Sequence, residues 1–225
     1  MPFFIGLCLN SASTLGQVHE IGVNVGALNY TGDLSAYYDP FEYRLAGQAF
    51  YRHNASKATS YRLGVIYGNL AGSDATPFDN LAQNRNYAFD RNLLEVDALV
   101  EYHFLDYKDP NSLIRWSPYF FGGVGLTYLF GTTTAPDGTA YQPFQPVIPV
   151  GMGFKWQVAP RLSINIDLGG RITFTDYLDD ISGVPTDTDA KNFLFGQWNT
   201  RDTYYYTGFS LCYTFYTIQC PYDTY

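Results

Sequence analysis

The chain has 225 residues, a formal net charge of −8, and 18% aromatic against 15% charged residues. This length suits a single all-β barrel, and the negative charge argues against binding to nucleic acid, whose phosphates attract a basic surface. No apolar run approaches the roughly 18 residues of a membrane-spanning helix. The aromatic residues are mainly Tyr and Phe, and such rings suit a membrane interface.

The first segment, residues 1–16, has an apolar core from Phe3 to Leu9 followed by small residues. This pattern resembles the end of a secretory signal peptide, although the basic start is missing, so we predict a truncated signal peptide. Cys8 lies in this segment, which leaves Cys212 and Cys220 in the mature chain. We expect no required disulfide.

From Gln17 onward, apolar and polar residues alternate with a period of two, which is typical of β-strands with one apolar face. The clearest example is 161–176, where Leu162 and Ile164 alternate with Ser163 and Asn165. Strands in soluble sandwiches are about five or six residues long, whereas a strand of a membrane barrel needs roughly 9–11. The expected strands are 18–30, 44–53, 60–68, 93–104, 116–130, 147–157, 161–176 and 204–215.

The connections between these strands alternate in length. Long ones are expected at 31–43, 71–92, 131–146 and 177–203, and short ones at 54–58, 106–115 and 159–160. Outer-membrane barrels have long external loops, short periplasmic turns and an even number of strands. The sequence therefore predicts an all-β, eight-stranded, antiparallel, up-and-down transmembrane β-barrel over residues 17–215, with a short periplasmic tail at 216–225.

A soluble barrel of the lipocalin type also has eight strands, but its apolar face points inward. In this chain charges share the face opposite the apolar residues, and no second layer is available to cover the apolar side. We therefore expect an outer-membrane location, with lipid as the surrounding medium.

Charged residues are expected on the inward face of several strands. They are Glu20, Arg62, Glu95, Asp97, Glu101, Lys155, Asp167 and Arg171. An eight-stranded barrel is just wide enough for side chains to fill, so these residues are expected to form a paired polar plug. The alternative is a narrow conducting pore, which needs a continuous water path.

A catalytic interpretation exists as well. Ser60, Glu101 and His103 all face inward near the periplasmic end, which is the set of groups needed for an activated nucleophile. The three histidines, His19, His53 and His103, lie near periplasmic strand ends, where the polarity of the rim explains them. We expect no catalytic residue, no cofactor and no enzymatic activity.

Carboxylates gather in the longest loop at Asp176, Asp179 and Asp180, and again at Asp187 and Asp189. Several carboxylate oxygens are what Ca²⁺ prefers, but the spacing is unlike that of an EF-hand. A solvated acidic external loop is the simpler interpretation.

Six segments resemble one family. They are VHEIGVNVGALNYTGDL (18–34), RNLLEVDALVEYHFLDY (91–107), SPYFFGGVGLTYLF (117–130), VIPVGMGFKWQV (147–158), TFTDYLDD (173–180) and YYYTGFSLCYTF (204–215). Together they are similar to the DUF6089 group of small outer-membrane barrels from Bacteroidetes-type bacteria, which includes the type IX secretion protein PorG. The resemblance implies an outer-membrane partner of the type IX export machinery that attaches to its periplasmic ring components, and it carries over no catalytic residue.

Two hypotheses about function follow. In the first, the chain is a non-enzymatic structural or anchoring barrel of a secretion assembly, which meets periplasmic or outer-membrane partner proteins through its periplasmic turns and residues 219–225. In the second, it is a stand-alone surface barrel whose long acidic loops bind an external ligand or surface.

Overall fold

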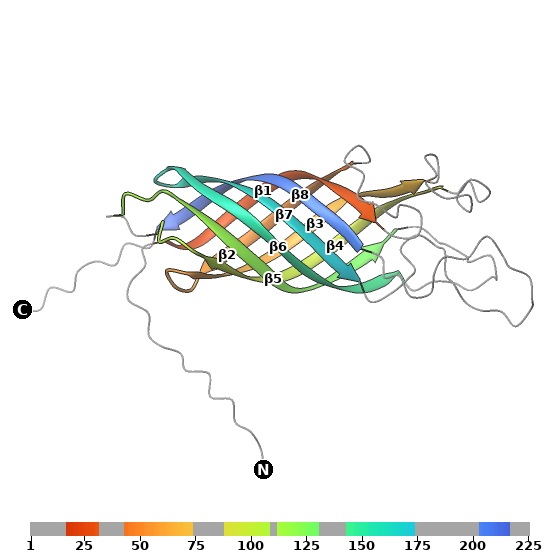
Figure 1. The fold of residues 1–225 in the computed structure, drawn as a ribbon, viewed down its shortest axis with the longest axis horizontal. Coiled ribbons are helices and arrows are strands. Elements are labelled where there is room, and N and C mark those ends of the chain that lie inside the picture. The colour runs from red at the N-terminus through yellow and green to blue at the C-terminus, as the bar shows by residue number, and fades with distance from the viewer. Residues whose placement is uncertain are drawn as a thin grey trace, which may run out of the picture.

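The computed structural model describes residues 17–31, 43–73, 88–108, 112–130, 143–173 and 203–216. The predicted signal peptide and almost all of the predicted tail lie outside these residues. Eight antiparallel strands form a closed barrel in which each strand pairs with its neighbours in sequence and β8 pairs with β1 (Figure 1). The strands are β1 (Gln17–Thr31), β2 (Arg44–Asn54), β3 (Thr59–Ser73), β4 (Ala88–His103), β5 (Trp116–Leu129), β6 (Phe144–Ala159), β7 (Leu162–Thr173) and β8 (Thr203–Tyr216).

The predicted fold class is confirmed, and the period-two pattern explains it. Along β7, Ile164 and Leu168 are 42% and 48% exposed, whereas Asn165 and Asp167 face inward and are buried. Because successive side chains point to opposite faces of a strand, the same alternation makes the outer wall apolar and the inner wall largely polar. Closure pairs the edge of β1 with that of β8, so no open strand edge faces lipid. The barrel spans the bacterial outer membrane.

No helix long and apolar enough to cross a membrane occurs among the described residues.

Several strands are longer than the sequence predicts. β3 continues to Ser73 and β4 begins at Ala88, so the predicted loop 71–92 is partly strand. The ladder continues through the pair Ala71 and Asp90. Where a strand extends beyond the lipid, its outer face need not be apolar. The period-two alternation of apolar and polar residues is therefore absent from these strand ends, and the sequence pattern does not identify them as strand. β6 likewise begins three residues before the predicted boundary. β7 is described as far as Thr173, and the last predicted residues of this strand, 174–176, lie outside the described residues.

The two ends of the barrel differ in their connections. The connections 55–58, 104–115 and 160–161 lie at the end where the first residue of β1 pairs with the last residue of β8. This is the periplasmic end, because outer-membrane barrels place their short turns and both chain ends there. The external end carries the connections 32–43, 74–87, 130–143 and 174–202.

The interior is not polar throughout. Near the external end, inward-facing apolar side chains form a buried cluster, which we call the apolar layer. Its members are Leu28, Tyr30, Ala46, Ile66, Leu70, Leu93, Leu129, Val147, Tyr204 and Tyr206. The inward-facing side chains are therefore not all polar, contrary to the simple expectation for a barrel interior. Side chains fill this interior, so apolar residues can pack there without contacting water.

Candidate functional site

The largest polar group in the interior begins at Glu20 of β1. The strand register places Glu20 directly opposite Arg52 of β2, and both side chains point inward. Glu20 accepts hydrogen bonds from Arg52 Nη1 at 2.9 Å, from Asn54 Nδ2 at 2.9 Å and from Lys155 Nζ at 2.5 Å. Two cations and an amide therefore compensate one buried carboxylate, as a dry interior requires.

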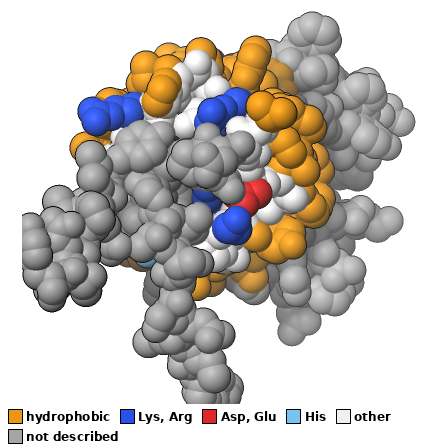
Figure 2. Space-filling view, turned by 90° about the vertical axis from the view of Figure 1, so that its left-hand side faces the viewer, with side chains coloured by type: hydrophobic (Ala, Val, Ile, Leu, Met, Phe, Trp, Pro, Cys, Tyr) orange, Lys and Arg blue, Asp and Glu red, His pale blue; other side chains and the backbone are white. Residues whose placement is uncertain are grey.

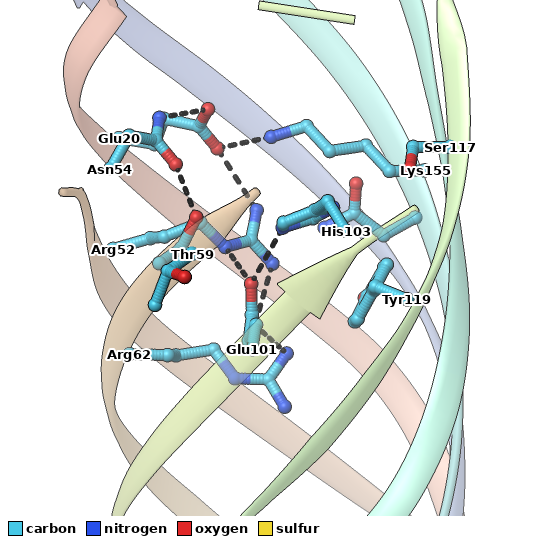
Figure 3. Close-up of polar contacts among 12 residues, drawn as sticks. Glu20, Arg52, Asn54, Thr59, Arg62, Glu101, His103, Ser117, Tyr119 and Lys155 are labelled. Atoms are coloured by element: carbon cyan, nitrogen blue, oxygen red, sulfur yellow. Dashed lines mark hydrogen bonds and ion pairs between the residues drawn. The ribbon is translucent and has the colours of Figure 1, made fainter. Parts of the chain in front are cut away.

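The same group continues across the barrel through Glu101. Arg52 Nε lies 2.7 Å from Glu101 Oε2, and Arg62 Nη1 lies 3.2 Å from Glu101 Oε1. Figure 3 shows Arg52 between Glu20 and Glu101, with Arg62 on the other side of Glu101. Arg62 also lies 3.2 Å from Asp167, whose other oxygen accepts a hydrogen bond from the Tyr119 hydroxyl. We call this set, with Lys155, the central ion-pair network.

Aromatic rings complete the surroundings of the two arginines. The guanidinium carbons of Arg52 and Arg62 lie 5.1 and 5.2 Å from the Phe50 ring centroid, and Arg62 lies 5.0 Å from that of Phe121. Cation–π contacts of this kind are strongest where water is absent. The rings also occupy the space beside the charges, so the central network is packed as well as paired.

A second, smaller group lies nearer the external end. Arg171 Nε is 3.3 Å from Glu95 Oε1, and the Tyr204 hydroxyl donates to Glu95 Oε2 at 2.7 Å. Arg171 also lies over the Tyr206 ring at 5.1 Å. This pair adjoins the apolar layer, because Tyr204 and Tyr206 belong to both.

Asp97 differs from the other buried carboxylates. It is 1% exposed, yet it forms no ion pair with any described residue. Its one hydrogen bond is a 3.4 Å contact from the Gln48 amide to Oδ2, and no described group bonds to Oδ1. Asp97 is therefore held less firmly than Glu20, Glu101 or Asp167.

The β4–β5 connection enters the periplasmic mouth of the barrel. Lys108 is fully buried, and its Nζ donates to Ser56 O at 2.9 Å and to Ser60 Oγ at 2.8 Å. The Tyr107 ring centroid lies 4.8 Å from Lys155 Nζ. Burial, helped by the positive charge of Lys155, lowers the pKa of Lys108 to about 7, and burial raises the pKa of Tyr107 well above its usual value.

The β4–β5 connection was predicted as a simple turn, and that prediction misses the buried residues Tyr107 and Lys108.

Figure 2 views the barrel from the periplasmic end and shows hydrophobic side chains around the rim, with basic and acidic side chains next to one another nearer the middle. One exposed ion pair here joins Lys57 Nζ to Asp106 Oδ2 at 2.9 Å.

All eight charged residues singled out from the sequence lie inside the barrel. The structure brings Glu20, Arg62, Glu101, Lys155 and Asp167 into the central network, Glu95 and Arg171 into the second group, and leaves Asp97 apart. Sequence reasoning omitted Arg52 and Tyr119 of the central network, and it also omitted the buried Lys108 at the periplasmic mouth. The inward face of β2 gives a signal for Arg52, but no local pattern indicates that Lys108 turns back into the barrel.

The proposed nucleophile and base do not meet. Ser60 Oγ donates to Asn54 Oδ1 at 2.7 Å and accepts from Lys108, whereas His103 Nε2 lies 3.3 Å from Glu101 Oε2. No hydrogen bond joins Ser60 to His103 in the part of the chain that the structure describes. Both side chains are almost fully buried, so a substrate has no direct access to them.

The calcium candidates Asp176, Asp179, Asp180, Asp187 and Asp189 lie outside the described residues. Within the described ranges, no group of three or more His, Cys, Asp or Glu side chains is arranged to hold a metal ion. Cys212 is buried and free.

The model of one family, DUF6089, described as a domain of unknown function, matches residues 1–223. A comparison with curated proteins found no match.

Several solved structures are similar to this chain at low sequence identity. OprG from Pseudomonas aeruginosa is 11% identical, with a TM-score of 0.49, and the match covers 91% of this chain and 100% of that one. Neisserial surface protein A is 10% identical, with a TM-score of 0.48 and coverage of 88% and 97%. A major outer membrane protein from Thermus thermophilus is 15% identical, with a TM-score of 0.45 and coverage of 88% and 99%.

Proposed function

Because this chain belongs to the DUF6089 family, we propose that it is a non-enzymatic structural or anchoring barrel of a type IX protein secretion assembly. The observation that carries the proposal is the filled interior. The central ion-pair network, the second polar group and the apolar layer occupy successive levels of the barrel. A conducting pore needs a continuous water path, and these packed levels oppose one.

A filled barrel acts through its surfaces. At the periplasmic end, Leu113 is 98% exposed, and Lys57 and Arg115 are also exposed. Exposed side chains on short turns between rigid strands suit contact with a partner, because little chain ordering is needed on binding. In this proposal these turns meet periplasmic or outer-membrane proteins of the secretion machinery.

The type IX part of the proposal is supported by the resemblance described above, which includes segments 91–107 and 117–130 on both sides of the β4–β5 connection. The non-enzymatic part is supported by the burial of Ser60 and His103, which are 0% and 2% exposed.

The test is site-specific photo-crosslinking in intact cells, followed by extraction in mild detergent and identification of the captured proteins. A photoreactive residue at Leu113 is expected to capture type IX ring or translocon components. The matched position is Tyr43 at the external end, which is also exposed and is expected to capture none of them.

A loop exchange separates the two hypotheses. Replacing residues 177–202 by a short Gly-Ser turn leaves capture at Leu113 unchanged if the barrel is an anchor. The alternative outcome has two parts. Cells with this variant show the same defect as cells that lack the protein, and Leu113 captures no type IX component. That outcome would instead favour a stand-alone surface barrel that binds an external ligand.

A further inference from the structure

Two of the three histidines of the sequence lie side by side on the outer wall. The strand register pairs His19 of β1 directly with His53 of β2, one residue from the periplasmic end of β2. Both side chains are half-buried on the face that carries Ile21 and Tyr51. Their ring centroids are 5.1 Å apart, and the ring planes are inclined by 34°.

This spacing suits two ligands of one metal ion. Imidazoles that bind a tetrahedral metal through nitrogen atoms about 2.1 Å away have ring centroids roughly 5 Å apart. Directly opposed residues of antiparallel strands have Cβ atoms about 4.5–5.5 Å apart, so the backbone holds the two rings at this separation without a loop having to close.

A neighbouring tyrosine fixes the orientation of one ring. His19 Nδ1 lies 2.5 Å from the Tyr51 hydroxyl oxygen. When Nδ1–H donates to that oxygen, Nε2 keeps its lone pair for a metal. Metal-binding histidines commonly use their second nitrogen in this way, and the hydrogen bond holds the ring and its tautomer. The stacked contact of the His19 and Tyr51 rings, with centroids 5.8 Å apart, further restricts the imidazole.

We propose that His19 and His53 form a two-imidazole site for a divalent transition-metal ion, Zn²⁺ or Cu²⁺, at the periplasmic rim of the outer wall. Imidazole nitrogen is a preferred ligand of both ions, and Cu²⁺ binds more tightly than Zn²⁺ at a site of given donors. The remaining coordination positions are open to water. A bound ion would join β1 to β2 beside the strand pair β1–β8 that closes the barrel.

The third histidine does not belong to this site. His103 is 2% exposed and faces the barrel interior, where it contacts Glu101. It therefore supplies a control within the same chain, because its removal changes the number of histidines and leaves the outer pair in place.

The test uses the full chain in detergent micelles, titrated with Zn²⁺ in competition with a chromophoric chelator. His19→Gln and His53→Gln are each expected to weaken zinc binding at least about tenfold, and Tyr51→Phe is expected to weaken it less, through loss of the orienting contact. His103→Gln is expected to leave the affinity unchanged. Migration of each unheated variant as a compact barrel on a denaturing gel establishes that it is folded.

A second measurement needs no variant. Electron paramagnetic resonance of the unmodified protein with one equivalent of Cu²⁺ is expected to show hyperfine splitting from two equivalent nitrogen donors. Splitting from no nitrogen would overturn the proposal. Zinc binding that survives the combined His19→Gln and His53→Gln substitution, or that disappears in folded His103→Gln, would overturn it as well.

Discussion

Arg52 and Glu101 meet through two contacts inside the barrel. Arg52 Nε lies 2.7 Å from Glu101 Oε2, and Arg52 Nη2 donates to Glu101 Oε1 at 3.0 Å. Both side chains are fully buried. The Nη2 hydrogen bond defines a direction, and the Nε contact adds a close approach of opposite charges. This pair therefore fixes how β2 and β4 face one another across β3.

Replacing Glu101 by Gln is expected to lower the free energy of unfolding by about 3–5 kcal/mol, the range for breaking one partner of a buried ion pair. The substitution leaves Arg52 and Arg62 with one carboxylate partner each, Glu20 and Asp167. Urea unfolding of the barrel in detergent micelles, followed by tryptophan fluorescence, measures the change. A loss below about 1 kcal/mol would show that water reaches the network.

Asp97→Asn is the matched control for that substitution. Asp97 is a buried carboxylate on the same strand, but it forms no ion pair with a described residue. Removing its charge avoids an uncompensated desolvation cost, so the free energy of unfolding is expected to stay the same or to rise by up to about 1 kcal/mol. The same unfolding experiment applies, and a loss as large as that of Glu101→Gln contradicts the assigned pairing.

Gly123 and Gly122 are adjacent on β5 but differ in the space around them. A Cβ at Gly123 would lie 2.0 Å from the Ala98 carbonyl oxygen, whereas the nearest atom to a Cβ at Gly122 is 3.9 Å away. Gly123→Ala is expected to prevent folding or to lower the free energy of unfolding by more than about 2 kcal/mol, because β4 and β5 must separate. Gly122→Ala is expected to fold normally. The fraction that migrates as a compact barrel on an unheated gel distinguishes them.

Lys108 predicts a pH dependence of stability. Its pKa falls from 10.5 to about 7 in the folded protein, mainly through burial. Between these values the unfolded chain holds a proton that the folded chain lacks, so the Lys108 contribution to the free energy of unfolding rises with pH across this window. Lys108→Met removes this contribution. Urea unfolding at both ends of the window should show a smaller rise with pH for the variant, and equal rises would contradict the prediction.

A charged residue on the outer wall is expected to lower the free energy of unfolding by an amount that depends on its depth in the membrane. Val124 lies near the middle of β5 and is 65% exposed, whereas Leu113 lies in the periplasmic connection and is 98% exposed. Val124→Lys is expected to cost about 2–4 kcal/mol of unfolding free energy in lipid bilayers, and Leu113→Lys about 0–1 kcal/mol. Equal costs would place the lipid band elsewhere on the barrel.

The sequence by itself determined the number of strands, their inward and outward faces and the alternation of the connections. These are local properties, because a period of two along β7 assigns each side chain to a face without knowledge of any other strand. The strand ends were less predictable, as at Ser73 and Ala88, because outside the lipid the two faces no longer differ in polarity.

Only the tertiary structure decided which charges meet. Lys155 and Glu20 are 135 positions apart in sequence and belong to strands that do not pair, yet Lys155 Nζ lies 2.5 Å from Glu20 Oε2. Partners across the lumen depend on the tilt and stagger of all eight strands together, which no single strand encodes. The insertion of Lys108 depends in turn on the acceptors that Ser56 and Ser60 offer at the mouth, so it too emerges only when the barrel is closed.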